Sequence, residues 1–211
     1  MLSPFHNESF TDFSKPENRQ KQQEALKLVA SQSAREYPLF IGGRDVTTGR
    51  TFKSMNPSHT SQVVGTFHKA GQAEVDLAMK AALEAFEKWR WVAPKERAII
   101  LLKAAAVMRR RKLEVNAWMI TEIGKSWPEA DADTSEAIDF LEFYAREALR
   151  WSEVKGATPF PNEFPELNYI PLGVGAIIPP WNFPMAILTG MTAAAIVTGN
   201  TVLLKPASDT P

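Results

Sequence analysis

The sequence predicts an α/β fold in which a helical layer with a β-hairpin leads into a strand–helix–strand unit. The main observation lies at 172–208, where two short apolar runs, 174–178 and 201–204, flank an almost uniformly apolar segment. Such runs suit strands buried on both faces, and the segment between them is long enough for a buried helix. The second observation is a series of long amphipathic segments between 72 and 151, which predicts helices that cover the sheet.

Residues 183–197 form the predicted crossover helix. Pro184 stands where a first helical residue would, because its φ is already set and it lacks an N–H that would be unpaired there. Asn182 is then close to the N-cap. Gly199 and Asn200 end the helix.

The polar residues that follow the two predicted strands mark a candidate ligand site. A crossover between parallel strands returns both carboxyl ends to one edge of the sheet, so Trp181, Asn182 and Lys205 should converge there. Ligands of open α/β sheets bind outside these strand ends. Gly173 and Gly175 precede the first strand, so they do not form a G-x-G-x-x-G pyrophosphate loop, and another mode of nucleotide binding is required.

The segments before 172 are expected to be helices and short strands. Residues 17–34 predict a polar helix, and residues 39–66 predict strands and turns. Further amphipathic helices are expected at 72–89, from 94 onward until Gly124, and at 128–151. Their predicted core stripes are Leu26, Leu28 and Val29; Val75, Met79, Ala82, Phe86 and Trp89; Ile99, Leu102, Ala106 and Leu113; and Ile138, Leu141, Ala145 and Leu149.

Three groups of polar residues admit a functional and a structural interpretation. The basic run 109–112 could bind phosphate, but a solvated helix C-terminus is favoured because the helix macrodipole attracts positive charge. Glu129, Asp131 and Asp133 suit the N-terminal turn of the next helix for the same reason. His59 and His68 lack partners at metal-ligand spacing and are interpreted as solvated or capping residues, so no metal site is expected.

Composition excludes several classes of protein. The chain has 211 residues, 45% hydrophobic and 23% charged, which is typical of a globular protein with one domain or slightly more. Lysine plus arginine equals aspartate plus glutamate at 24 each, so no net field favours nucleic acid or an anionic membrane. There is no cysteine, signal peptide or membrane span, and we expect a cytoplasmic location.

Two motifs resemble the aldehyde dehydrogenase superfamily: PWNFP at 180–184 and GN-T-V-LLKPAS-TP at 199–211. The longer string PLGVGAIIPPWNFP…AAAIVTGNTVLLKPAS is most similar to the 1-pyrroline-5-carboxylate dehydrogenase branch, and the likeness runs from Phe10 onward. It implies the aldehyde dehydrogenase fold, truncated after the first βαβ unit of a Rossmann-like sheet. The expected parts are a leader helix (1–36), a helical part of the cofactor-binding domain with a β-hairpin (37–152), a linker or oligomerisation arm (153–171) and the start of the NAD-binding sheet (172–211).

The resemblance implies NAD-dependent oxidation of L-glutamate γ-semialdehyde, formed from 1-pyrroline-5-carboxylate, to L-glutamate in proline or arginine catabolism. The family's nucleophile is a cysteine thiolate and this chain has none, so we expect the N-terminal portion of a longer enzyme, inactive alone and homo-oligomeric when complete. A dehydrogenase of another aldehyde, or a non-catalytic fragment that acts as an interaction module, are the alternatives.

Residue roles follow from the same resemblance. Asn182 matches the side-chain donor to the oxyanion, while Glu136 and Phe183 match residues near the aldehyde. Lys205 matches the lysine that binds the adenosine ribose, and Ser208 stands where many relatives hold a glutamate that repels NADP, so NADP should be tolerated beside NAD. The expected contacts to the nicotinamide side are Ile178, Pro179, Pro180 and Trp181.

Each of these residues also has a structural interpretation. Asn182 could cap the crossover helix. Glu136 could be a surface charge, Lys205 could point to water, and Phe183 could provide ordinary packing at the start of the helix. The 178–181 segment could be a rigid strand-to-helix turn, which is compatible with contact to a cofactor.

Overall fold

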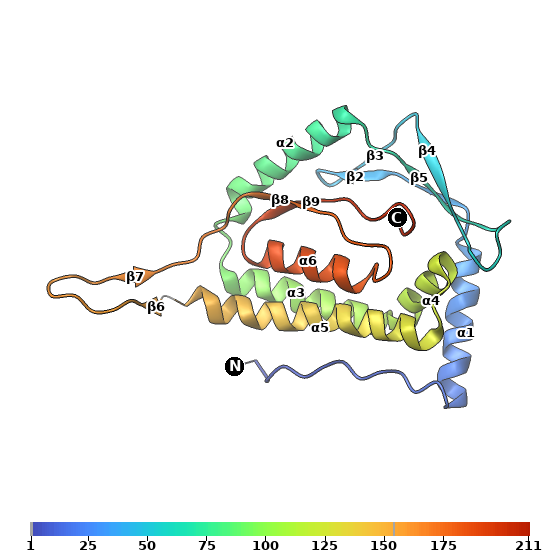
Figure 1. The fold of residues 1–211 in the computed structure, drawn as a ribbon, viewed down its shortest axis with the longest axis horizontal. Coiled ribbons are helices and arrows are strands. Elements are labelled where there is room, and N and C mark those ends of the chain that lie inside the picture. The colour runs from blue at the N-terminus through green and yellow to red at the C-terminus, as the bar shows by residue number, and fades with distance from the viewer. Residues whose placement is uncertain (1, 154) are drawn as a thin grey trace.

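The end of the chain forms the predicted strand–helix–strand unit in the computed structural model, which describes residues 2–153 and 155–211. Strands β8 (Val174–Ile177) and β9 (Thr201–Leu204) are parallel, in register from Val174↔Thr201 to Ile177↔Leu204. Helix α6 (Ala186–Val197) connects them (Figure 1). The predicted α/β class with a parallel sheet is therefore confirmed.

The predicted start of the crossover helix was wrong. Helix α6 begins at Ala186 and its N-cap is Met185, so Pro184 lies in a turn outside the helix and Asn182 is not the cap. The Ala186 N–H donates instead to Asp133 Oδ1, at 2.6 Å, from a distant helix. Because Asp133 is 53 positions away in the sequence, no local pattern indicates this hydrogen bond.

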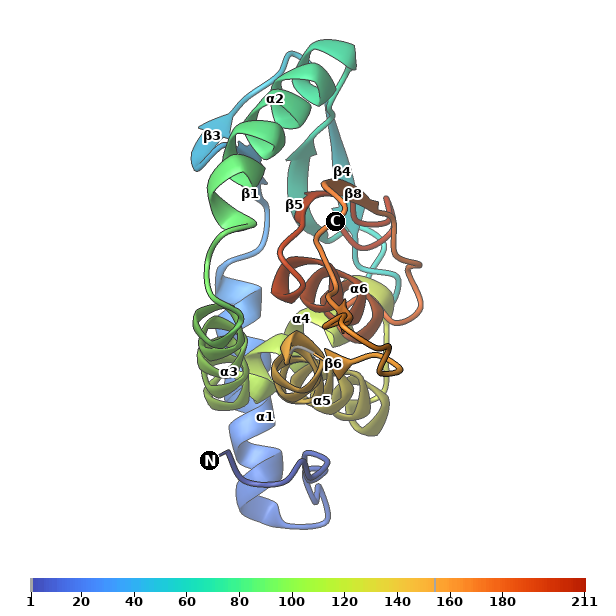
Figure 2. The same ribbon diagram turned by 90° about the vertical axis from the view of Figure 1, so that its left-hand side faces the viewer.

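The helical layer consists of α3 (Pro94–Arg110), α4 (Lys112–Ile123) and α5 (Trp127–Ser152). Helix α4 ends at Gly124, as predicted, in the left-handed conformation (φ 71°). Helices α3 and α5 pack along each other beneath α6, as Figure 2 shows from their ends. At Gly190 of α6 an added Cβ would lie 2.9 Å from the Phe140 ring, so a side chain there would push α6 away from α5.

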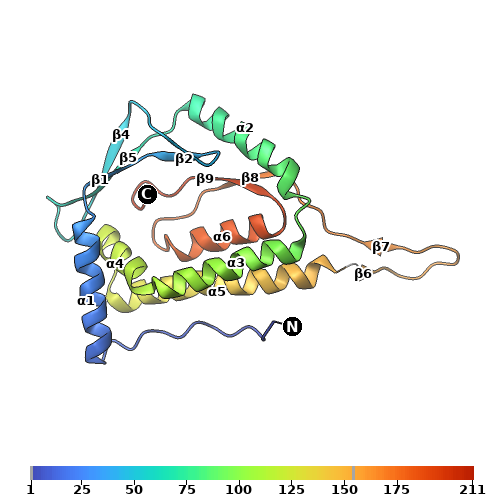
Figure 3. The same ribbon diagram turned by 180° about the vertical axis from the view of Figure 1, so that it is seen from behind.

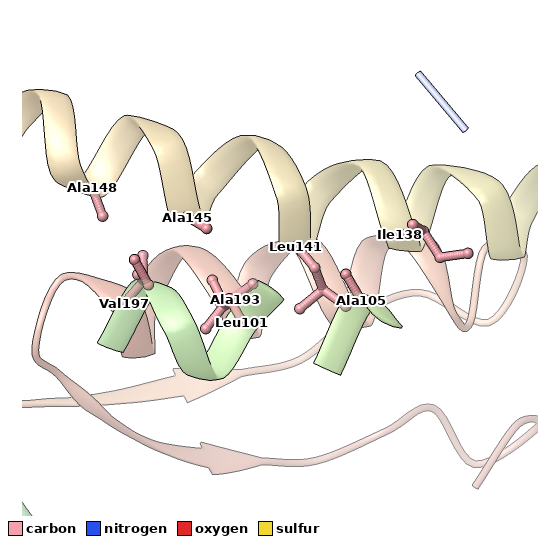
Figure 4. Close-up of a cluster of buried hydrophobic side chains, with 9 residues drawn as sticks. Leu101, Ala105, Ile138, Leu141, Ala145, Ala148, Ala193 and Val197 are labelled. Carbon is pink, nitrogen blue, oxygen red and sulfur yellow. The ribbon is translucent and has the colours of Figure 1, made fainter. Parts of the chain in front are cut away.

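Small residues make this close packing of three helices possible. The core side chains of α3, α5 and α6 point toward one another in Figure 4. The predicted face of α3 was only partly right: Leu102 packs against this core, but Ile99 is 39% exposed and the fully buried positions lie one residue before the predicted ones. Alanines on the buried face of α3 leave room for α5 to pack against it, as dense protein interiors require. The cluster comprises Ala98, Leu101, Ala105, Ile138, Leu141, Ala145, Ala148, Ala193 and Val197.

Helix α2 (Gln72–Trp89) has the predicted bounds and packs on β8 and β9. In Figures 1 and 3 the two strands run between α2 and α6. Side chains join the layers, because Thr201 Oγ1 donates to Ala82 O at 2.9 Å and Trp89 Nε1 donates to Ile196 O at 2.8 Å. Only part of the predicted stripe is buried, since Val75 and Met79 are 45% and 41% exposed.

A second β structure, separate from the β8–β9 pair, precedes α2. Strand β5 (Val63–His68) lies between β1 (Arg35–Tyr37), which is parallel to it, and β4 (Thr51–Met55), which is antiparallel. Strands β2 (Leu39–Ile41) and β3 (Arg44–Val46) form a hairpin.

Helix α1 (Pro16–Ser31) packs on α4 and is shorter than predicted. Gln32 caps it, and Ala34 has a positive φ of 63°, which no helix interior accepts. Its buried residues are Gln22, Ala25 and Val29, whereas Leu28 is 46% exposed. The predicted stripe was therefore partly right, since Val29 is buried and Leu26 packs against the same cluster with α4.

Residues 155–167 form an arm. Strands β6 (Lys155–Gly156) and β7 (Glu166–Leu167) pair antiparallel, and the hairpin extends away from the helices in Figure 1. Its shape is that of the expected arm, and its part in oligomerisation stays a prediction. Within 2–153 and 155–211 no helix is long and apolar enough to cross a membrane.

The interpretation of the basic run was wrong, and that of His68 was only partly right. Lys112, the last residue of the basic run, is buried and pairs with Asp131 at 3.0 Å, so the run is not simply solvated. His68 is also buried, and its Nε2 lies 2.6 Å from Glu36 Oε1. The His68 ring is not solvated, but its Nδ1 accepts from the Thr48 backbone N–H at 2.8 Å, as a capping residue does. In the described part of the chain, no three His, Cys, Asp or Glu side chains gather in a way that could hold a metal ion.

Candidate functional site

The carboxyl ends of β8 and β9 lie at one edge of the parallel pair. Ile177 is in register with Leu204, and the Lys205 N–H donates to Ile177 O at 2.9 Å, so the backbones leave the sheet together. The segment 178–185 starts at this edge and leads into α6. The structure therefore brings the strand ends that carry Asn182 and Lys205 to the same side of the sheet, as parallel pairing requires.

The segment after β8 exposes large apolar side chains. Ile178 is 64% exposed, Trp181 55% and Phe183 39%, whereas Pro179 is buried and anchors the turn. Pro180 is exposed. Neighbouring exposed apolar groups at a strand edge are typical of a surface that a ligand or another part of a protein covers.

Asn182 has a side chain that is free to bind a ligand. The structure excludes the alternative in which it caps α6, because the cap position belongs to Met185. Asn182 is exposed, and among the described residues no hydrogen bond holds its amide. Its backbone is constrained nevertheless, since the next carbonyl, Phe183 O, accepts from Ile187 N at 3.2 Å.

Asp133 and Lys125 support this turn from below, and sequence reasoning missed both. Asp133 is fully buried, and its Oδ2 lies 2.6 Å from Lys125 Nζ while its Oδ1 accepts from Ala186. Lys125 Nζ also lies 4.3 Å from the centre of the Phe183 ring. In the sequence, Asp133 was explained by its place near the positive N-terminal end of a helix. Only the fold shows that it pairs with Lys125 and with the start of α6.

Glu136 lies one helical turn after Asp133 on α5. Residues three apart on a helix are neighbours on its surface, so Glu136 stands close to the point where Asp133 meets the start of α6. Its side chain is exposed and makes no hydrogen bond or ion pair with the described residues. The geometry is compatible with either a surface charge or a group that faces a ligand.

Lys205 and Ser208 lie on the other strand end. Both are exposed, and Lys205 Nζ donates to Pro206 O at 3.0 Å, leaving further N–H groups of the ammonium for a ligand. Ser208 lies in the turn that the Thr210 N–H closes onto Ala207 O at 3.1 Å. An ammonium group and a hydroxyl beyond one strand, with Ile178 and Trp181 beyond its neighbour, form an edge that suits a nucleotide with a flat aromatic ring.

Known proteins are similar to this chain in sequence and in fold. Residues 44–211 match the aldehyde dehydrogenase family. The 1-pyrroline-5-carboxylate dehydrogenase of Geobacillus thermodenitrificans is 51% identical over 211 residues, which are 100% of this chain and 41% of that protein. A solved structure of 1-pyrroline-5-carboxylate dehydrogenase from Thermus with bound NAD has a TM-score of 0.95 and 49% identity over 99% of this chain and 41% of its own.

A third likeness is to a larger protein. The structure of proline utilization A from Bdellovibrio bacteriovorus has a TM-score of 0.96 and 37% identity, over 98% of this chain and 22% of its own. The chain thus spans about two fifths of the length of the dehydrogenases that it matches. By the extent of the family match, this chain belongs to the aldehyde dehydrogenase family.

Proposed function

We propose that this chain is the N-terminal part of an NAD-dependent dehydrogenase that oxidises L-glutamate γ-semialdehyde to L-glutamate. The observation that carries the proposal is the exposed, unpaired Asn182 amide at the edge shared by two parallel strand ends. The likeness to a 1-pyrroline-5-carboxylate dehydrogenase with bound NAD, at 49% identity, supports the choice of substrate and cofactor.

The residues of this chain would act on the aldehyde by orienting it and stabilising its charge. The Asn182 Nδ2–H group donates a hydrogen bond to the aldehyde oxygen as that oxygen gains negative charge, and a preorganised donor of this kind is worth about 3 to 4 kcal/mol. Phe183 shields the chain of the aldehyde from water, and Glu136 faces the polar end of the substrate. The thiol nucleophile of the family would come from outside these 211 residues, which contain no cysteine.

The edge of β8 and β9 would hold the cofactor. Lys205 would donate to the adenosine ribose, while 178–181 would contact the nicotinamide side. Bound NAD supplies the hydride acceptor. Because Ser208 is neutral, it does not repel a 2′-phosphate, and we propose that NADP is used as well as NAD. Comparing kcat/KM for the two cofactors tests this, and complete rejection of NADP would contradict it.

The test of the function uses the complete protein that contains this chain. We expect reduction of NAD with 1-pyrroline-5-carboxylate, at a higher kcat/KM than with simple aldehydes such as propanal. Asn182→Ala should lower kcat by about a hundredfold or more and leave the KM for NAD nearly unchanged, because the lost donor acts on the transition state. Unchanged turnover would remove this role from Asn182.

Asn200 provides a matched control at the opposite end of the same strands. Its Oδ1 accepts from the N–H groups of Leu172 and Gly173, at 2.6 and 3.0 Å, so it holds backbone and does not face the proposed site. Asn200→Ala should lower the melting temperature and retain kcat. Equal losses of kcat in the two variants would indicate damage to the fold instead of loss of a donor.

The arm suggests an assembly. Phe164 is 97% exposed and Phe160 64%, and such side chains on an isolated hairpin favour contact with another copy. We propose that the complete protein forms a homo-oligomer through this arm. Light scattering of a variant without 157–165 tests this proposal. We also propose a cytoplasmic location, since a reducing compartment keeps a thiol nucleophile reduced.

A further inference from the structure

The loop between α4 and α5 sends a charged side chain toward the turn that carries Asn182. Lys125 lies between Gly124, which ends α4, and Ser126, which caps α5, so its backbone is held at both sides. Ser126 Oγ accepts from the N–H of Glu129, and the Glu129 carboxylate accepts in return from the N–H of Ser126. Lys125 therefore projects from a rigid point of the helical layer.

The position of the Lys125 ammonium is defined by two contacts. It lies 2.6 Å from the buried Asp133 Oδ2 and 4.3 Å from the centre of the Phe183 ring, with only 11% of its side chain exposed. Cation–π attraction strengthens when the cation is shielded from water. The ion pair thus holds a cation against one face of the ring of the residue next to Asn182.

Asp133 reaches the other end of the same turn. Its Oδ1 accepts from the Ala186 N–H at 2.6 Å and so fixes the start of α6. One carboxylate consequently binds the backbone at the end of the turn and, through Lys125, the ring in its middle. This arrangement leaves the turn little freedom, although Trp181, Asn182 and Phe183 are exposed.

We propose that Lys125 and Asp133 are positioning residues for aldehyde oxidation, which hold the 178–185 turn so that Phe183 and Asn182 keep one arrangement toward the aldehyde. This inference rests on the proposed function, because it concerns the turn that receives the substrate. The pair does not touch the aldehyde itself. Its effect should appear in aldehyde kinetics, since a displacement of about 1 Å in a positioning element can cost up to a hundredfold in rate.

The experiment replaces Lys125 in the complete protein. Lys125→Met keeps most of the length and removes the charge, and it should lower kcat/KM for 1-pyrroline-5-carboxylate by about tenfold or more while the KM for NAD stays within about twofold. Lys125→Arg retains a cation that binds a carboxylate and stacks on a ring, so it should restore most of the activity. Activity unchanged in Lys125→Met, or no recovery with arginine, would overturn the proposal.

Lys112→Met is the matched control. Lys112 also pairs with a buried aspartate of α5, at 3.0 Å. Its ammonium also donates to Ser9 O of the N-terminal leader, not to the 178–185 turn. This variant should lose thermal stability as Lys125→Met does and keep kcat/KM within about twofold of the unchanged protein. If activity follows the melting temperature equally in both variants, the Lys125 pair has a structural role only.

A double-mutant cycle with Phe183→Leu tests the contact itself. If Lys125 acts through the ring, Lys125→Met should add little to the effect of Phe183→Leu on the KM for the aldehyde. Additive effects would contradict that route. If Lys125→Met proves poorly stable, Lys125→Gln, which also removes the charge, can replace it in the cycle.

Crystal structures of the unchanged protein and Lys125→Met give a result that does not depend on activity. The Phe183 ring should change its orientation and 181–183 should shift, whereas an unmoved turn would overturn the inference. An unchanged protein that oxidises no aldehyde would count against the proposed function, and these structures would still decide whether Lys125 positions the turn.

Discussion

Two buried aspartates of α5, Asp131 and Asp133, each pair with a lysine, and the two pairs hold different parts of the chain. Asp131 accepts from Lys112 and from Asn116 and also binds the leader, through Thr11 N and Thr11 Oγ1, both at 2.7 Å. Asp133 accepts from Lys125 and from the first N–H of α6. One pair therefore secures the leader to the helical layer, and the other secures the candidate active-site turn.

The difference arises from helix geometry. Positions two apart on an α-helix point about 200° away from each other, so Asp131 and Asp133 face opposite sides of α5. Neither lysine can replace the other. Acidic residues that are neighbours in sequence can therefore serve unrelated tasks, and a favourable helix dipole explains neither of them fully.

The largest expected effect is that of Asp131→Ala. The substitution leaves the buried Lys112 ammonium and Asn116 without their carboxylate and releases Thr11, so it should lower the free energy of unfolding by about 3 to 5 kcal/mol. Chemical denaturation measures this. Since the leader is not part of the turn, the KM for the aldehyde should remain unchanged in protein that stays folded. A raised KM would show that the two pairs are coupled.

A third carboxylate, that of the partly buried Glu122, has a neutral partner instead of a lysine. Burial acts to raise the pKa of Asp131, but bonds from Thr11, Lys112 and Asn116 outweigh it and hold that pKa below its ordinary value. The Glu122 carboxylate accepts a hydrogen bond from the neutral Ser54 hydroxyl at 3.0 Å, and burial raises the pKa of Glu122 to about 7. Stability from Asp131 is therefore present above pH 4 or so and lost in acid, whereas that from Glu122 behaves in the opposite way.

Glu122→Gln is the second prediction. A group whose pKa rises from 4.5 to about 7 on folding stabilises the protein most below pH 4.5 and loses that contribution as the pH rises through 7. The whole change is on the order of 3 kcal/mol. Glutamine still accepts from Ser54 and carries no charge, so the fall in stability between pH 5 and 8 should largely disappear. An equal fall in both proteins, measured by urea denaturation, would contradict the assignment.

The smallest predicted effect belongs to Thr11→Val. It removes the hydroxyl bond to Asp131 and keeps the shape of the side chain and the backbone bond, so it should cost about 1.5 kcal/mol. Thermal unfolding should show a modest decrease. Aldehyde kinetics should not change, and a loss comparable with that of Lys125→Met would contradict the separation of leader and turn.

Local pattern was enough to predict most elements. The bounds of α2 were predicted exactly as the structure has them, and those of α5 to within one residue, because each helix combines regular apolar spacing with clear end signals. The parallel β8 and β9 followed from two aliphatic runs and the helix between them. The roles of Asn182, Glu136 and Lys205 came from their motifs and remain predictions.

Other features depended on contacts that no local pattern records. The Ala186 N–H at the start of α6 donates to Asp133 of another helix, and the fully buried positions of α3 lie one residue before the predicted ones, such as Ile99. Lys112 was predicted to be solvated, but in the fold it pairs with the buried Asp131. In each case the partner is at least 19 positions away, beyond the reach of periodicity.

By itself, the sequence determined the order of the elements, the parallel strand–helix–strand unit and the motifs that lie at its edge, because spacing of apolar residues and turn residues acts within a few positions. The tertiary structure alone decided which charges are buried, which carboxylate meets which lysine, and how the turn with Asn182 is held. Burying a charge is costly unless a partner meets it, so these choices depend on where distant segments pack.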